Sequence, residues 1–291
     1  MTPSRRRRSA EGMHVLITGA ASGIGRAAAE QLAADGAVLY LTDVQQERLD
    51  AVAATIRAAG GKVALAESAD VRDIDAVRTV ADHVHAQRDA LDAVMNVAGI
   101  ATWGTVSTLT HEQWKAVIDI NLMGPIHVIE SFVPQMVEAQ RGGHLVNVSS
   151  AAGLIGLPWH AAYSASKFGL RGVSEVLRFD LRRHGIAVTL VCPGGVDTPL
   201  TESVTIANLD KTSAVFAKTQ AHFRKRAVSA DEAAAAIVRG MLARRYLVFT
   251  SRDIWLIHAI QRHVPPLYAL VMRIFNRGAD VVSARAAKAS S

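Results

Sequence analysis

The sequence predicts an α/β fold built on a doubly wound parallel sheet, with helices on both faces. Short apolar runs bounded by turn residues alternate along the chain with longer, alanine-rich helical stretches. The runs are apolar throughout instead of alternating with polar residues, as expected for strands that are covered on both faces. Regular strand–helix alternation is typical of parallel sheets with right-handed crossover connections.

The elements follow in order along the chain. Strands are expected at 14–18, 38–42, 63–67, 93–96, 144–149 and 187–192. Helices are expected at 24–35, 45–59, 74–86, 112–139 and 161–183. Because no Pro/Ser-rich linker interrupts residues 12–250, this stretch is predicted to be one domain, with a basic, disordered extension over 1–11 and an apolar, basic C-terminal extension over 251–291.

Composition narrows the function classes. Half of the 291 residues are hydrophobic and 20% are charged, as in ordinary globular proteins. Cys192 is the single cysteine, so the chain can form no internal disulfide and no multi-cysteine metal site. The histidines show no zinc-ligand spacing, and we expect no metal. These features suit a reducing compartment, and we expect a cytoplasmic protein.

The formal net charge of +6 is unevenly distributed. Four arginines occupy 5–8, and residues 239–291 hold nine Lys/Arg against two Asp, so the body between these ends is acidic. A nucleic-acid surface would need a basic face over the domain itself, and none is expected. The basic ends could instead attract an anionic surface or simply aid solubility. No secretory signal follows the arginine run, and no long uninterrupted apolar run predicts a transmembrane helix.

A glycine-rich turn follows the first predicted strand and precedes the first helix. It reads Thr18-Gly19-Ala20-Ala21-Ser22-Gly23-Ile24-Gly25. Glycines allow a tight turn and close approach of a pyrophosphate, while the helix N-terminus supplies free N–H groups and a positive dipole. The GxxxGxG spacing differs from GxGxxG, and a plain structural turn is the alternative. Its position between strand and helix favours dinucleotide binding.

Asp43 closes the second predicted strand. A carboxylate there can accept both hydroxyls of an adenosine ribose and would repel a 2′-phosphate. No Lys or Arg stands in the glycine turn or directly after Asp43. The sequence therefore favours NAD over NADP. An ordinary acidic residue at a helix N-terminus is the alternative interpretation.

Tyr163 and Lys167 are four residues apart on a predicted helix and therefore share one face. Tyrosine ionises near pH 10 and is a poor base at neutral pH. A nearby ammonium group, together with an oxidised nicotinamide, is expected to lower the pKa of the phenol. The phenol could then exchange a proton with an alcohol or carbonyl oxygen as hydride moves. Alone, such a pair is more often a surface tyrosine beside a lysine.

Several further motifs accompany this pair, in a fixed order. They are the TGAASGIG turn, Asp70-Val71, Asn96-Val97-Ala98-Gly99, Asn121, Ser149-Ser150, the YSASK segment and Pro193-Gly194-Gly195-Val196-Asp197-Thr198. In these motifs the sequence resembles the short-chain dehydrogenase/reductase family, over about residues 12–250. The resemblance implies a single Rossmann-type domain and an NAD(P)-dependent oxidoreductase that acts on CH–OH groups.

The resemblance also implies a role for each matching position. The catalytic residues would be Ser150, Tyr163, Lys167 and Asn121. Ser150 lies 13 residues before Tyr163, at the spacing usual in the family, and would bind the substrate oxygen. Asn121 would support a water-linked proton path. The cofactor would contact Thr18, Gly19, Ser22, Gly23, Ile24, Gly25, Asp43, Asp70, Val71, Asn96, Ala98, Gly99, Tyr163, Lys167, Pro193, Gly194, Val196 and Thr198. The family often has a second asparagine at the position of Val97, so a side-chain contact from there is not carried over.

Apolar residues gather near the predicted reaction centre. Trp103, Leu157 and Trp159 are expected to line the substrate pocket, together with Leu200 at the start of a substrate lid over about 199–226. Such surroundings favour a small hydrophobic alcohol or ketone. The alternative is that these residues only pack the lid onto the body. His160 could contact the substrate or lie at the rim.

The C-terminal extension matches the family least. Two apolar runs, 254–264 and 267–275, are split by Pro265-Pro266 and interspersed with arginines. Each run is too short to span a bilayer but could lie on its surface, which would make the protein peripherally membrane-associated. A helix pair capping the pocket and a subunit contact are equally open. The resemblance further implies a homodimer or homotetramer.

The sequence thus predicts an enzyme that transfers hydride between NAD(H) and the alcohol or ketone carbon of a hydrophobic substrate, with Tyr163 as general acid/base. An NADP-dependent carbonyl reductase is one alternative. A binding module that senses nucleotides or a lipid surface without using the site is the other.

Overall fold

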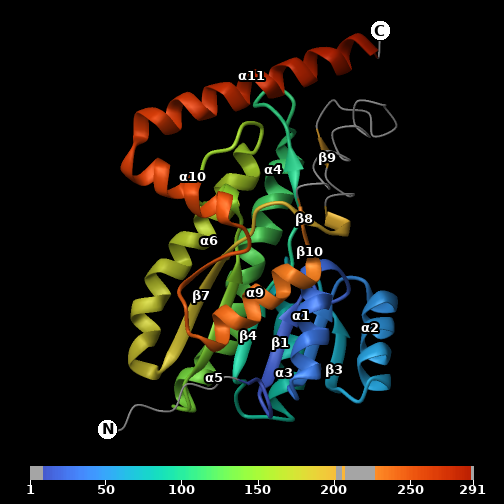
Figure 1. The fold of residues 1–291 in the computed structure, drawn as a ribbon. Coiled ribbons are helices and arrows are strands. Elements are labelled where there is room, and N and C mark those ends of the chain that lie inside the picture. The colour runs from blue at the N-terminus through green and yellow to red at the C-terminus, as the bar shows by residue number, and fades with distance from the viewer. Residues whose placement is uncertain (1–8, 201–204, 207–226, 290–291) are drawn as a thin grey trace.

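A computed structural model describes residues 9–200, 205–206 and 227–289 of the chain, without the side chains of residue 252 and residues 279–289. Most of the predicted N-terminal extension and of the predicted lid therefore lies outside the described residues. The predicted doubly wound sheet is confirmed (Figure 1). Its seven strands are β1 (His14–Thr18), β2 (Val38–Asp43), β3 (Lys62–Ser68), β4 (Ala93–Asn96), β6 (Gly143–Val148), β7 (Ile186–Cys192) and β11 (Leu247–Phe249).

All pairings within this sheet are parallel, in the order β3-β2-β1-β4-β6-β7-β11. The chain winds outward from β1 to β3 and then returns to place β4 on the other side of β1. The order therefore reverses between β1 and β4, and ligands of open parallel sheets bind at the carboxyl ends of strands at such a point. The edge strand β11 was not predicted from the sequence, because three residues are too few to show a pattern.

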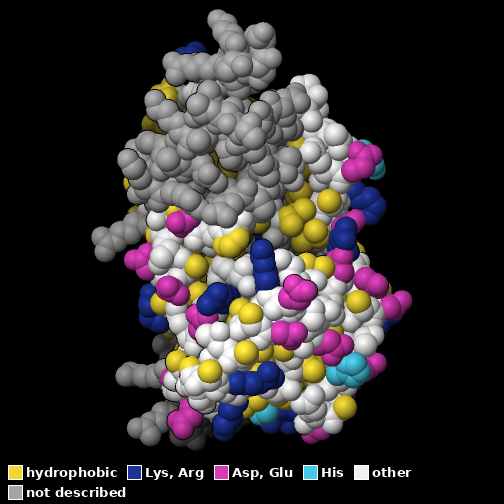
Figure 2. All heavy atoms as spheres, turned by 90° about the vertical axis from the view of Figure 1, so that its right-hand side faces the viewer, with side chains coloured by type: hydrophobic (Ala, Val, Ile, Leu, Met, Phe, Trp, Pro, Cys, Tyr) yellow, Lys and Arg dark blue, Asp and Glu magenta, His cyan; other side chains and the backbone are white. Residues whose placement is uncertain are grey.

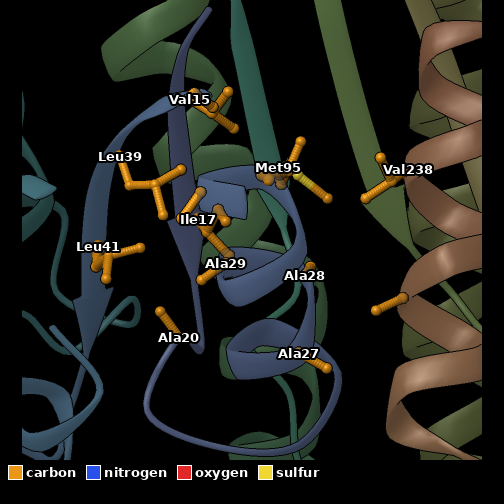
Figure 3. Packing of buried hydrophobic residues seen from close by; sticks show 14 of the residues in the cluster. Val15, Ile17, Ala20, Ala27, Ala28, Ala29, Leu39, Leu41, Met95 and Val238 are labelled. Carbon is orange, nitrogen blue, oxygen red and sulfur yellow. The ribbon is translucent and has the colours of Figure 1, made fainter. Parts of the chain in front are cut away.

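Helices cover both faces, and each face has its own hydrophobic core. Within one strand, neighbouring residues enter different cores: Val15 and Ile17 of β1 belong to one cluster and Leu16 to the other. Figure 3 shows the first cluster, in which alanines of α1 lie against the side chains of β1, β2 and β4. Small side chains let α1 approach the sheet closely. The sheet-flanking helices are α1 (Gly23–Ala34), α2 (Gln46–Ala58), α3 (Ile74–His85), α5 (Gly124–Glu138), α6 (Ala161–Asp180) and α9 (Ala230–Leu242).

The predicted helix at 112–139 is interrupted. It consists of α4 (His111–Ile118), one π-helical turn at Asp119–Met123 and α5. By length and composition, His111–Glu138 is the one helix in the described part of the chain that could cross a membrane, and 39% of its most apolar window is buried. Phe132 and Met136 are buried in the second core, so the stretch serves here as a core helix.

The C-terminal segment adds two helices, α10 (Arg252–His263) and α11 (Pro265–Ala289). They meet at an angle, and α11 crosses the end of the molecule at which the sheet strands have their carboxyl ends (Figure 1). Two short parallel pairs lie near that end. These are β5 (Thr102–Trp103) with β9 (Thr205–Ile206), and β8 (Val196–Asp197) with β10 (Val228–Ser229).

Candidate active site

A cavity of about 750 Å³ opens at the carboxyl ends of the sheet strands, where the strand order reverses. This volume lies within the range of small-molecule and cofactor sites. The predicted site residues that line it are Gly19, Ser22, Gly23, Ile24, Gly25, Asp43, Asp70, Val71, Ala98, Gly99, Trp103, Ser150, Leu157, Tyr163, Lys167, Pro193, Gly194, Val196, Thr198 and Leu200. Segments far apart in the sequence thus meet in a single hollow.

The glycine-rich turn needs its glycines for two reasons. Gly19 has φ of 68°, in the left-handed region, and a Cβ there would lie 2.8 Å from the Ala98 backbone. A Cβ on Gly25 would lie 2.1 Å from the Gly19 carbonyl oxygen. The turn leads directly into α1, whose N-cap Ser22 makes no side-chain capping bond. The first N–H groups of α1 are therefore available for an anion in the cavity.

Asp43 stands at one end of this cavity in a fixed position. One carboxylate oxygen accepts a hydrogen bond from the Ala21 N–H (3.1 Å), and the other accepts one from the Gln45 N–H (3.0 Å). The carboxylate keeps further lone pairs for ribose hydroxyls, because each oxygen can accept more than one bond. Asp43 therefore joins the glycine turn to the start of α2 and faces the same cavity.

Two arginines that sequence reasoning missed also line this end. Arg72 forms an ion pair with Asp70 at 2.5 Å, and this pairing lowers the pKa of the Asp70 carboxyl. Arg48, on α2, forms no ion pair among the described residues. It lies five positions after Asp43, so only the helix brings it back to the cavity. A search limited to the residues directly after Asp43 could not find it.

Tyr163 and Lys167 lie on the first turns of α6 and both face the cavity. The Lys167 Nζ lies 5.7 Å from the centre of the Tyr163 ring. It donates a hydrogen bond to the Val148 carbonyl oxygen at 3.0 Å, its one such partner in the described part of the chain. An ammonium group has three donors, so two remain for ribose hydroxyls in the cavity.

Burial shifts the pKa of both side chains. Desolvation raises the pKa of the Tyr163 phenol, and a hydrogen bond with Ser150 opposes this shift. Burial lowers the pKa of Lys167 to about 8, so the ammonium form still predominates at neutral pH. In the chain by itself the phenol pKa is therefore raised, because desolvation outweighs the hydrogen bond with Ser150. The lowered pKa expected from the sequence concerns the site with an oxidised nicotinamide and stays a prediction.

Asn121 connects two segments of the site through hydrogen bonds of its side chain. It is fully buried in the π-helical turn. Its amide oxygen accepts from the Ile100 N–H (2.9 Å), while its amide nitrogen donates to the Ile100 carbonyl (2.9 Å) and to the Ser166 hydroxyl (3.3 Å). Asn121 thus ties the segment after β4 to α6. It does not line the cavity, so its contact here is with the scaffold.

Three other predicted residues also lie outside the cavity lining. Thr18 is buried, and its hydroxyl accepts hydrogen bonds from the N–H groups of Val97 and Ala98, both at 3.1 Å. Asn96 is buried and its amide nitrogen donates to the Asn147 side chain at 2.9 Å. These two residues therefore shape the strand ends instead of facing a ligand.

Trp159 is the third predicted site residue that lies outside the cavity lining. Its backbone has φ of 65°, and its carbonyl accepts a hydrogen bond from the Gly104 N–H at 2.8 Å. This turn places the next residue, His160, in the cavity lining instead. The His160 ring lies 4.6 Å from the Trp103 ring and 6.2 Å from the Tyr163 ring, between centres. Sequence reasoning left His160 open between substrate contact and rim, and the structure places it beside the phenol.

Ile254 of α10 is a further lining residue that sequence reasoning missed. It belongs to a small third core with Leu154, Ile155 and Cys192. No local signal marks it, because only the folded tail brings α10 to the cavity. Within the described residues, no group of three His, Cys, Asp or Glu side chains could hold a metal ion.

Comparison with known proteins decides the family. The model of the short chain dehydrogenase family matches residues 13–208. The chain belongs to the short-chain dehydrogenase family. The 3-oxoacyl-[acyl-carrier-protein] reductase FabG of Thermotoga maritima is 37% identical to it over 194 residues, which cover 67% of this chain and 78% of that protein. The predicted family is confirmed, and this short-chain dehydrogenase is an NAD(P)-dependent oxidoreductase.

Solved structures agree on the fold. A short-chain dehydrogenase/reductase from Burkholderia phymatum in complex with NAD superposes with a TM-score of 0.78 at 27% identity, covering 89% of this chain and 96% of that one. A metagenomic short-chain oxidoreductase in complex with NADP gives 0.65 at 31% identity, covering 82% and 95%. Both nicotinamide cofactors thus occur among structures similar to this short-chain dehydrogenase.

Proposed function

We propose that this short-chain dehydrogenase transfers a hydride between NAD(H) and the alcohol or ketone carbon of a hydrophobic substrate, with Tyr163 as general acid/base. The observation that supports this most is the meeting of Tyr163, Lys167 and Ser150 in one cavity with the glycine-rich turn and Asp43. The glycine turn, the open start of α1 and the free donors of Lys167 fit a dinucleotide.

The protein's own residues handle the proton. In the oxidation direction Tyr163 acts as the phenolate, which the positive charges of Lys167 and of an oxidised nicotinamide favour. The alcohol O–H gives its proton to the phenolate oxygen while the Ser150 hydroxyl donates a hydrogen bond to the substrate oxygen. The bound nicotinamide supplies the hydride acceptor or donor. In the reduction direction, the phenol O–H donates to the carbonyl oxygen. The raised pKa of Tyr163 keeps the phenol protonated at neutral pH in the chain alone, which is the form that reduction requires.

Asp43 supports a preference for NAD. Its carboxylate is fixed by two backbone N–H groups and faces the cavity, so a 2′-phosphate placed beside it would be repelled. The substrate end is lined by Trp103, Leu157, Leu200 and Ile254. These side chains offer apolar surface, which favours a hydrophobic alcohol or ketone.

A panel of steroid, retinoid, fatty and small alcohols, assayed with NAD and with NADP, tests this proposal. Reduction of the nicotinamide is followed at its near-ultraviolet absorbance band. We expect turnover of the apolar alcohols with a higher kcat/KM for NAD. No turnover with any alcohol, and none with the matching ketones and reduced cofactor, would contradict the reaction class. A higher kcat/KM with NADP would contradict only the role assigned to Asp43.

Arg48 favours a second candidate, an NADP-dependent carbonyl reductase. Its guanidinium has no ion-pair partner among the described residues and lines the same cavity as Asp43. A guanidinium binds phosphate well. The variant Arg48→Gln separates the two candidates: it should leave kcat/KM with NAD within about twofold, and a large selective loss with NADP would support the second.

We further propose that the protein forms homo-oligomers through α6 and resides in the cytoplasm. Val176 and Phe179, three residues apart on α6, are 59% and 58% exposed, and Phe168 is also exposed. Apolar side chains gathered on one helix face favour a subunit contact. The single cysteine, Cys192, is free and buried, which suits a reducing compartment. Light scattering and cell fractionation test these two proposals.

A further inference from the structure

One side of α11 exposes a row of apolar residues to solvent. Leu267, Leu270 and Ile274 are 44%, 52% and 59% exposed, and Val264, just before the helix, is 46% exposed. The spacing of three or four residues places Leu267, Leu270 and Ile274 on one helix face. Another side of α11 carries Tyr268, which packs onto the third core. The exposed row is therefore a second apolar face with no cover among the described residues.

This face has a basic border. Arg262 of α10 and Arg273 and Arg277 of α11 are exposed, and Asp253 is the one acidic residue between 252 and 278. Trp255 of α10 is also 56% exposed. The side of the molecule that carries α2 has charges of both signs, because Figure 2 shows Lys and Arg interspersed there with Asp and Glu. Apolar residues, a tryptophan and single-sign basic residues together are typical of helices that lie in a membrane interface.

We propose that the face formed by Val264, Leu267, Leu270 and Ile274, with its arginine border, docks on the surface of an anionic phospholipid bilayer. The apolar row would enter the boundary between headgroups and acyl chains, while the guanidinium groups contact lipid phosphates. A second copy of the chain fits this face less well, because a two-fold contact would bring the arginines of both copies together.

The same two helices reach the substrate end of the cavity. The Tyr268 hydroxyl accepts a hydrogen bond from the Gly156 N–H at 2.9 Å and lies 3.4 Å from the Gly156 carbonyl oxygen, next to the cavity-lining Leu157. Ile254 of α10 lines the cavity itself. Docking through α10 and α11 therefore keeps the substrate end close to the lipid, where hydrophobic substrates concentrate. This last consequence rests on the proposed function, whereas the docking does not.

Sedimentation of the full-length protein with vesicles tests the docking. Vesicles of phosphatidylcholine alone are compared with vesicles that contain about a third of phosphatidylglycerol. We expect binding to the anionic vesicles that weakens with added salt, and much weaker binding to the neutral ones. Hydrogen exchange on the wild-type protein should show new protection over 264–277 when anionic vesicles are added. Absence of binding to the anionic vesicles would overturn the proposal.

Two matched double variants localise the contact. Arg273→Gln/Arg277→Gln removes two charges from the face, and Arg182→Gln/Arg183→Gln removes two from the short helix that follows α6. We expect the first pair to weaken binding on the order of tenfold and the second to leave it within about twofold. Equal losses in both would overturn the proposal.

Leu267→Ser/Leu270→Ser/Ile274→Ser should also abolish vesicle binding. If it changes the oligomeric state and leaves vesicle binding intact, the face is a contact between copies instead. Cofactor binding serves as the check that each variant is folded.

Discussion

The two ends of the cavity are built in different ways. The dinucleotide end comes mainly from one continuous stretch, β1 to β4, in which a turn, a helix start and a carboxylate follow one another within 30 residues of sequence. The substrate end is assembled from β5, the segment around Leu157, the start of α6 and α10. Local backbone geometry thus determines the first end, and tertiary packing determines the second.

This difference has consequences for substitution. At the dinucleotide end, backbone atoms approach so closely that a single methyl group cannot be added at Gly25. At the substrate end, apolar side chains and one tyrosine hydroxyl hold the segments together, so single changes are expected to shift substrate affinity instead of abolishing the site.

Gly25→Ala tests the backbone packing of the dinucleotide end. The added Cβ would lie 2.1 Å from the Gly19 carbonyl oxygen, so the turn must open. We expect the Kd for the cofactor, measured by calorimetry, to rise by about a hundredfold or more. Gly172→Ala on α6 is the control, because its Cβ would meet nothing within 4 Å and should leave the Kd unchanged. A cofactor Kd that stays the same in both variants would contradict the account of the turn.

Lys167 is the point at which the two ends join, and its burial predicts a pH effect on stability. Its folded-state pKa of about 8 lies below the value of about 10.4 for an unfolded chain. Between these values the unfolded chain binds more protons, so the free energy of unfolding rises with pH, by up to about 3 kcal/mol.

This contribution can be isolated by urea unfolding of wild type and Lys167→Met without cofactor, from about pH 7 to about pH 10. The free energy of unfolding of wild type should increase, relative to that of Lys167→Met, as the pH rises from about 7 to about 10. Lys115→Met, at an exposed position, should run parallel to wild type. Parallel curves for Lys167→Met as well would show that Lys167 keeps an ordinary pKa.

Asp43→Asn tests the electrostatic part of the dinucleotide end. The change removes the negative charge and leaves the side chain nearly the same size. We expect the ratio of kcat/KM for NAD to that for NADP to fall by about tenfold, because the repulsion of a 2′-phosphate is lost. Asp50→Asn on α2 lies outside the cavity and should not alter the ratio. An unchanged ratio in Asp43→Asn would assign cofactor choice to other residues, with Arg48 the first to test.

Tyr268→Phe tests the packing of the substrate end. It removes the hydrogen bonds to Gly156 while the ring remains in the third core. One neutral hydrogen bond contributes about 1 kcal/mol to the packing of α11 on the segment at Gly156, so we expect KM for the alcohol to rise by at most about fivefold, with little change in the cofactor Kd. Tyr246→Phe is the control, because its buried hydroxyl has no hydrogen-bond partner among the described residues. Equal effects in both would remove the assigned role of Tyr268.

The same contrast explains what the sequence could predict. The sheet, its first six strands and the glycine turn leave local signals, since buried strands are apolar runs and the turn needs glycine at Gly19 and Gly25. Arg48 and Ile254 leave no such signal, because a helix and a distant tail bring them to the cavity. Thr18 and Asn96 belong to matching motifs, yet the Thr18 hydroxyl and the Asn96 amide nitrogen form hydrogen bonds within the scaffold and neither residue lines the cavity.

The pKa of Tyr163 in the folded chain is another property that the sequence alone could not predict. Spacing places Lys167 next to the phenol, and charge alone predicts a lowered pKa. The folded chain buries both groups, and the desolvation of the phenol then dominates. Burial of this kind depends on the segments that close over α6, which the spacing of two residues cannot reveal.

The proposed proton transfer by Tyr163 is tested with Tyr163→Phe, by measuring kcat and the cofactor Kd on the same preparation. The substitution removes only the hydroxyl that we propose exchanges the proton. We predict that kcat falls by about a thousandfold or more, while the Kd for NAD changes by no more than about twofold. Turnover close to that of wild type, with cofactor binding intact, would contradict the assignment of Tyr163 as the general acid/base.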